Sequence, residues 1–185
     1  LLEAVDLPGA AAPPLARLVG FNSEDPWQVV DFLEPLRAGA QADVELLHQL
    51  AQAYERTARF ELAYEVGLEA VHAGGYEHLL WVGQVAEGGL DDLSIALSCW
   101  MAALDLDAQN TVVLQALEEA CTRRGAYRLL AACWVDVAER LEGSERDDVL
   151  GRLVDLAAGL LGDAAVECAA VGELIATKDS LTRRL

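Results

Sequence analysis

Residues 44–72 read VELLHQLAQAYERTARFELAYEVGLEAVH. Apolar side chains recur at the helical spacing in both halves of this stretch. They form two stripes, first Leu46, Leu47, Leu50, Tyr54 and Ala58, then Phe60, Ala63, Tyr64, Gly67, Leu68 and Val71. Between the stripes, the residues Thr57-Ala58-Arg59 leave room only for a tight turn. Two helices joined so closely must lie antiparallel, so the stretch predicts a helical hairpin.

The hairpin pattern recurs along the chain. When the sequence is aligned with itself, it superposes at an offset of 33 residues and then of 34. Five positions superpose across the three copies, and just after the turn an aromatic residue or Leu stands in every copy. The superposed sets are Leu47/Leu80/Leu114, Ala58/Asp91/Gly125, Phe60/Leu93/Tyr127, Ala63/Ala96/Leu130 and Ala70/Ala103/Val137.

This pattern resembles the tetratricopeptide repeat, a helix–turn–helix unit of 34 residues. The resemblance covers residues 44–144 as three copies, 44–76, 77–110 and 111–144. The family's signature slots are matched by Leu47, Leu50, Ala51, Tyr54, Ala63 and Ala70 in the first copy, by Leu80, Leu93, Ala96, Trp100 and Ala103 in the second, and by Leu114, Leu117, Gly125, Tyr127 and Trp134 in the third. It implies an all-α protein, a right-handed α-solenoid of antiparallel helix pairs.

Some positions depart from the family pattern. The second copy has Gly83 and Glu87 at slots for large apolar residues, followed by Gly88-Gly89, so its first helix should be weak or short. The third copy has Glu118 at a slot for a small residue, and no copy ends in Pro.

The flanking segments predict degenerate, capping helices at both ends. Residues 1–43 form an N-terminal pair whose second helix starts with Asp25 as N-cap and Pro26 at the first position, and is kinked or shortened by Pro35 on its way to Gly39. Residues 145–176 form a C-terminal pair broken at Gly162-Asp163, and residues 177–185 form a frayed tail. Because the chain begins without Met and ends abruptly, we expect it to be a piece of a larger protein.

Composition and charge exclude several classes. Hydrophobic residues make up 54% of the chain and charged residues 24%, which excludes wholesale disorder. The formal net charge of −18 repels phosphates and anionic lipids, so we expect no nucleic-acid partner. The longest run free of charge, Leu93 to Leu104, is too short to cross a bilayer, so we expect no membrane insertion.

No constellation in the sequence carries chemistry. The histidines His48, His72 and His78 lack metal-binding spacing, and the four cysteines form no CxxC pair. We therefore expect buried cysteines in a reducing, cytoplasmic setting, with no metal and no cofactor. A set of nucleophile, base and orienting residue is not discernible, so we expect no catalytic residues and no enzyme activity.

The resemblance instead implies a binding surface. In the family, first helices line a concave groove and contact a partner through fixed repeat positions. These positions correspond to Glu45, His48, Gln52, Glu55 and Arg56 in the first copy, His78, Trp81 and Val85 in the second, and Val112, Gln115, Glu119, Thr122 and Arg123 in the third. For each residue the alternative is a merely solvated helix face. Trp81 is either an exposed anchor for a peptide or a residue buried against Gly88-Gly89.

Chaperone-docking members of the family clamp a carboxylate with Lys and Asn, which the corresponding positions here lack, so we expect no such clamp. Acidic groove positions favour a basic or neutral amphipathic peptide or helix of another protein. The main hypothesis is thus a protein–protein interaction scaffold or adaptor. Two alternatives stay open: a self-association module that forms homo-oligomers, and a regulatory or recruiting arm of an enzyme whose catalytic domain lies elsewhere.

Overall fold

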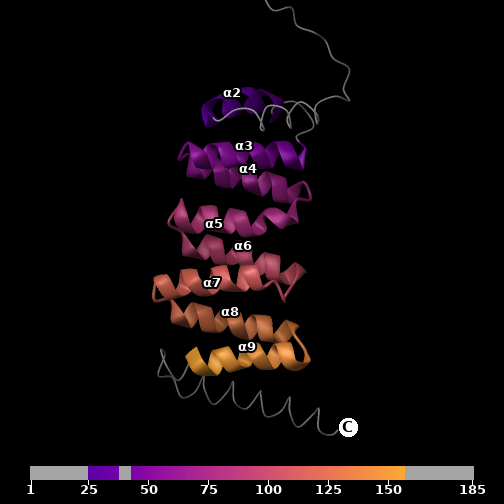
Figure 1. Cartoon of the computed structure of the whole chain (residues 1–185), viewed down its shortest axis with the longest axis vertical. Coiled ribbons are helices and arrows are strands. Elements are labelled where there is room, and N and C mark those ends of the chain that lie inside the picture. Colours follow the sequence, from indigo (N-terminus) through magenta and orange to yellow (C-terminus); the bar gives the residue numbers. More distant parts are fainter. Residues whose placement is uncertain (1–24, 38–42, 157–185) are drawn as a thin grey trace, which may run out of the picture. The chain divides into compact units, whose positions relative to one another are not determined.

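The computed structural model describes residues 25–37 and 43–156, and every regular element in these ranges is helical (Figure 1). The all-α prediction is confirmed for this part of the chain. The elements are α2 (Pro26–Arg37), α3 (Val44–Arg56), α4 (Phe60–His72), a 3₁₀ turn η1 (Tyr76–His78), α5 (Leu79–Gly88), α6 (Leu93–Leu106), α7 (Thr111–Arg123), α8 (Tyr127–Arg140) and α9 (Gly143–Leu156).

The chain divides into two compact units, Leu1–Ala96 and Leu97–Leu185. In the first unit α2 packs on α3, α3 on α4, and α4 on η1 and α5. In the second unit α7 packs on α8 and α8 on α9. Within each unit, the helices named here thus pack on the next one along the chain, as expected of successive antiparallel hairpins.

The tight turn of the hairpins recurs at the spacing that the sequence predicts. Ala58 and Asp91 both have φ of 57° and Gly125 has φ of 64°, and these are the three superposed turn positions. At Ala58 the backbone N–H of Arg59 donates to Tyr54 O at 2.9 Å, and at Gly125 the N–H of Ala126 donates to Cys121 O at 2.8 Å. Both turns therefore close the helix with the left-handed residue and the six-to-one hydrogen bond of a Schellman motif.

Two reciprocal substitutions, Ala58→Gly and Gly125→Ala, test this turn. Because a left-handed φ strains a residue that has a Cβ atom, Ala58→Gly should raise the free energy of unfolding by about 1 kcal/mol. Gly125→Ala should lower it by about the same amount, since a Cβ there meets no atom within 4 Å and only the backbone strain changes. Urea unfolding followed by circular dichroism measures both; a loss of stability in Ala58→Gly would contradict the turn assignment.

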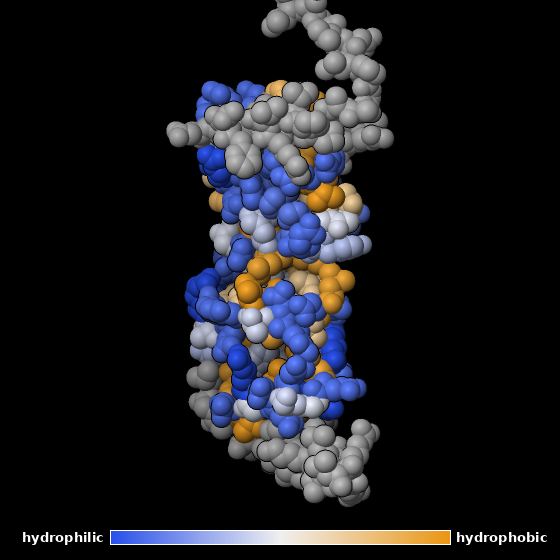
Figure 2. Space-filling view, turned by 45° about the vertical axis from the view of Figure 1, so that its right-hand side comes forward, coloured by the Kyte–Doolittle hydropathy of each residue, from blue (hydrophilic) through white to orange (hydrophobic). Residues whose placement is uncertain are grey.

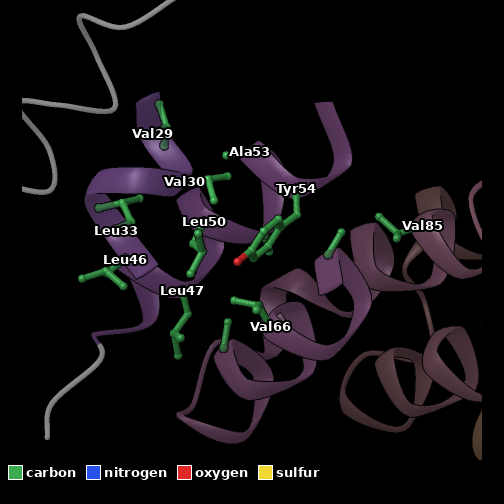
Figure 3. Packing of buried hydrophobic residues seen from close by; sticks show 13 residues of the cluster. Val29, Val30, Leu33, Leu46, Leu47, Leu50, Ala53, Tyr54, Val66 and Val85 are labelled. Atoms are coloured by element: carbon green, nitrogen blue, oxygen red, sulfur yellow. The ribbon is translucent and has the colours of Figure 1, made fainter. Parts of the chain in front are cut away.

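The core of the first unit lies between α2, α3, α4 and α5. Figure 3 shows apolar side chains from these helices pointing toward one another, with Leu50 and Val66 fully buried among them. Small residues lie where helices approach closely: Ala51, Ala63 and Ala70 have no exposed surface. The helices pack tightly because these side chains take up so little room between them.

Polar contacts tie α2 to the next hairpin. Arg37 donates from Nε and Nη2 to the two carboxylate oxygens of Glu69 in α4, at 3.0 and 2.6 Å. The hydroxyl of Tyr54 donates to Glu34 Oε2 at 2.7 Å, and burial raises the pKa of Tyr54 to about 12. The Arg59 guanidinium lies 5.2 Å from the ring centroid of Trp27. Helix α2 is thus an integral layer of the first unit.

The second unit repeats the packing with larger side chains. Leu117 and Cys121 of α7, Leu130 and Val137 of α8, and Leu153 of α9 are buried. Trp134 is buried in α8, as is its repeat equivalent Trp100 in α6. Two ion pairs join helices that are two apart along the chain. Arg140 of α8 pairs with Asp105 of α6 at 2.8 Å, and Arg152 of α9 pairs with Glu118 of α7 at 3.2 Å.

The predicted element bounds agree with the structure in most places. The backbone N–H of Trp27 donates to Asp25 Oδ1 at 3.0 Å, which confirms the predicted N-cap of α2. The expected short first helix of the second copy is also found, because η1 replaces its first turn and α5 has only 10 residues. Helix α9 begins at Gly143, with φ of 62°, and not at the predicted Glu145. The helix predicted in residues 1–19 and the last helix and tail from 163 to 185 lie outside the described residues, and α2 is described as far as Arg37.

Candidate interaction surfaces

The first helices of the first two copies meet along one surface of the first unit. We call it the α3–α5 wall, and it consists of Glu45, His48, Gln52, Glu55, His78 and Trp81. The imidazole rings of His48 and His78 are stacked, with centroids 3.8 Å apart and planes 12° from parallel. The indole of Trp81 meets His48 edge-on, at 5.3 Å and 83°. The structure therefore brings together predicted site residues that are 30 and 33 positions apart in the sequence.

Trp81 is half-buried and packs against the hydrophobic core of the first unit. Its indole N–H donates to Glu55 Oε2 at 2.9 Å. A face of the ring lies against Gly67 of α4, where a Cβ atom would be 2.9 Å from Trp81 Cζ3. Trp81 therefore packs against Gly67 and not against Gly88-Gly89, the alternative that the sequence left open. Phe60 is the residue whose ring lies against Gly89. One side of Trp81 is fixed by α4, and the indole N–H is oriented by Glu55.

The polar side chains of the wall are linked along α3. Gln52 Nε2 lies 2.8 Å from His48 Nε2, and Gln49 Nε2 donates to Glu45 Oε1 at 2.7 Å. Burial lowers the pKa of His48, and the neighbouring His78 lowers it further, against the opposing fields of Glu45 and Glu77. At neutral pH the wall consequently presents the neutral imidazole of His48 between exposed or half-exposed carboxylates.

The predicted positions of the third copy lie on α7 in the second unit. There an open depression of about 660 Å³ is lined by Gln115, Glu118, Glu119, Thr122 and Arg123. Gln115 Nε2 donates to Glu119 Oε1 at 2.7 Å, so the polar side chains are already ordered along the helix. Four of the five lining residues are predicted site residues; Val112 is exposed at the start of α7. Arg56 of α3 and Arg123 are both exposed at the C-terminal ends of their helices.

Two residues of these surfaces, Glu77 and Glu118, were not predicted as site residues from the sequence. Glu77 of η1 lies beside His78, with Oε1 3.7 Å from His78 Nε2, and Glu118 takes part in the α7 depression through its pair with Arg152. Glu118 and Arg152 are 34 positions apart, so the repeat offset itself was a usable signal for this pair. Glu77 gave no such signal, because its position depends on η1, where the helix expected there is replaced by a 3₁₀ turn.

The cysteines of the described residues, Cys99, Cys121 and Cys133, are free thiols. Cys99 and Cys121 are buried free thiols, and burial raises the pKa of Cys121 to about 11. In the described part of the chain, His, Cys, Asp and Glu side chains form no group of three that could hold a metal ion. Nor is any helix among the described residues long and apolar enough to cross a membrane.

These features define the class: an all-helical protein made of antiparallel hairpins that recur at a spacing of 33–34 residues. A scan of the chain against models of known protein families gives no match, and a search of curated proteins gives none either. The tetratricopeptide resemblance therefore stays a prediction that depends on the repeated residues themselves.

Proposed function

We propose that this protein is an interaction scaffold of tetratricopeptide type, which binds a basic or neutral amphipathic segment of another protein on its first helices. The observation that carries the proposal is the α3–α5 wall, where residues from two successive copies contact one another on one surface. An aromatic side chain at its centre and carboxylates at its edge suit an amphipathic helix whose apolar face is flanked by Lys or Arg.

Charge supports a cationic partner. In the first unit the described residues include thirteen carboxylates but only three basic residues, Arg37, Arg56 and Arg59. Arg37 is paired with Glu69, and Arg59 lies over Trp27 and Tyr54. Figure 2 shows that hydrophilic side chains cover most of the visible face of the described residues. A field of this sign accelerates the approach of a cationic segment and repels an acidic one.

A designed peptide can test the proposal without knowledge of the natural partner. The probe is a labelled helical peptide with Leu on one face and Lys on the other, and binding is read as fluorescence polarisation. We expect binding that weakens with added salt and is lost when Glu replaces Lys in the peptide. Glu45→Gln with Glu55→Gln should weaken it about fivefold, because each exposed charge contributes up to about 1 kcal/mol.

The matched control removes two carboxylates from another surface. Glu61→Gln with Glu65→Gln changes the net charge equally, but both residues lie exposed on α4. If the control weakens binding as much as the wall variant, only net charge matters and the proposed site is wrong. Equal binding of a peptide with the same composition but scrambled order would likewise contradict an amphipathic partner.

Self-association is the second candidate, and the exposed aromatic side chains of α2 favour it. Trp27 is 50% exposed and Phe32 is 39% exposed, although large apolar residues are usually covered. Light scattering over a concentration series, done on the samples used for the peptide titration, distinguishes the two. A mass that rises with concentration and falls in Trp27→Ser would identify a homo-oligomer.

A further inference from the structure

The stacked histidines join two elements of the α3–α5 wall. His48 belongs to α3, and His78 is the last residue of η1, directly before α5. Their rings stack at 3.8 Å, and Trp81 of α5 meets the same His48 ring from the side. The contact between η1 and α3 at this place is therefore made by two imidazole rings, and imidazole is the side chain whose ordinary pKa lies closest to neutral pH.

The surroundings of His48 suit a neutral ring. Its Nε2 is engaged with Gln52, and its Nδ1 is buried without a hydrogen-bond partner among the described residues. Gln52 Nε2 can only donate, so His48 Nε2 accepts this hydrogen bond and the neutral ring carries its own proton on Nδ1. Protonation would place a second N–H at Nε2, where it faces the N–H group of Gln52 and removes this hydrogen bond, at a cost that rises with burial. The same proton would bring a positive charge within stacking distance of His78.

The carboxylates around His48 and His78 favour protonation of His48 only weakly. Glu45 of α3 and Glu77 of η1 are the carboxylates that act on His48, and both are exposed, so solvent screens them. Helix α5 faces the pair with Trp81, whose N–H is bound to Glu55. On the other sides of α3, Glu69 of α4 is paired with Arg37 of α2, and Glu34 accepts the Tyr54 hydroxyl.

We propose that the His48–His78 pair makes the α3–α5 wall pH-sensitive: neutral rings hold η1 against α3, and protonation of both rings releases η1 and the start of α5, including Trp81. The proposal concerns the wall of the free protein, so it holds or fails independently of any binding partner.

The direction of the pH dependence follows from the linkage between protonation of His48 and opening of the wall. Burial, and then the field of His78, lowers the pKa of His48 in the closed wall, whereas in an opened wall it returns to about 6.5. The open state therefore binds more protons between these two values, and closure weakens as the pH falls below about 6.5. Because the ring in an opened wall has the ordinary pKa of about 6.5, lowering the pH to about 5.5 can weaken the closed state by at most about tenfold.

Amide hydrogen exchange of the full chain tests the proposed pH sensitivity. The exchange is read by mass spectrometry and corrected for the intrinsic rates at each pH. Between about pH 7.5 and about pH 5.5, residues 76–82 should lose up to about tenfold in protection, while residues 113–121 of α7 serve as the internal reference. His48→Gln should abolish most of this loss. His72→Gln, at the exposed end of α4, should leave it unchanged.

A second measurement does not depend on any variant folding. In NMR titrations of the wild-type imidazole protons, one histidine should titrate below the ordinary value. A separate titration of His78→Gln, which does need a folded variant, should show a higher pKa for that histidine because the like charge is removed. The proposal is overturned if residues 76–82 keep their protection at the lower pH, if they lose it equally in His48→Gln, or if all three histidines titrate together in the ordinary range.

Discussion

Leu50→Ala should lower the free energy of unfolding by about 2–5 kcal/mol, a large share of the stability of a domain of this size. Leu50 has no exposed surface and lies in the cluster where α2, α3 and α4 meet (Figure 3). Truncation removes buried methyl groups and leaves a cavity that the neighbouring helices can fill only in part. Urea unfolding of the full chain, followed by circular dichroism, measures the change.

Leu106→Ala is the matched control for this measurement. Leu106 ends α6 and is 61% exposed, so the same truncation there should change the free energy of unfolding by less than about 0.5 kcal/mol. If the two variants were equally stable, the buried layer between the first three helices of this unit would be wrongly assigned.

Gly67→Ala is expected to lower the free energy of unfolding by about 1–3 kcal/mol, although Ala usually favours a helix over Gly. The added Cβ would lie 2.9 Å from both Trp81 Cζ3 and Val82 Cγ2, closer than van der Waals contact allows. Helix α5 must then move away from α4, or Trp81 must turn out of the wall. Because Trp81 is held by Glu55 and touches His48, the substitution should also weaken peptide binding to the α3–α5 wall.

Gly151→Ala separates packing from helix propensity. Gly151 is also within a helix, α9, but a Cβ there meets nothing within 4 Å. We therefore expect a gain of about 0.5–1 kcal/mol at this position, opposite in sign to the effect at Gly67. Two losses of similar size would mean that the close approach of α5 to Gly67 is not the cause.

The arrangement assigns different tasks to the two helices of a hairpin. In the first unit the second helix α4 contributes small residues such as Ala63 and Gly67, which let its neighbours approach closely. The first helices α3 and α5 then present longer polar and aromatic side chains on the wall. Because Glu45 and Gln52 of the wall are exposed, they can be substituted with little effect on the buried core.

Local order was predictable because it depends on short-range chemistry. The starts of α4, α6 and α8 at Phe60, Leu93 and Tyr127 agree with the repeat offset, since each follows a turn whose left-handed residue closes the preceding helix. The alternation of apolar and polar side chains likewise placed Leu46, Leu47, Leu50 and Tyr54 on the buried face of α3.

The contacts within the candidate site could not be predicted in the same way. The sequence placed His48, His78 and Trp81 on first helices, but not in stacking distance, and it left open whether Trp81 was exposed or buried at Gly88-Gly89. Its actual contact with Gly67 depends on how closely α5 approaches α4, and the position of His78 depends on the 3₁₀ turn before α5.

For the described residues, the amino-acid sequence by itself thus determined most of the helices, the recurring turn and the acidic composition, because periodicity, capping residues and charge act within a few residues or add along the chain. The tertiary structure alone decided which predicted site residues touch. Side chains from separate hairpins meet only when inter-helix distances are set by the fit of many small contacts, and Gly67 beneath Trp81 is the place in this protein where that fit is closest to the proposed site.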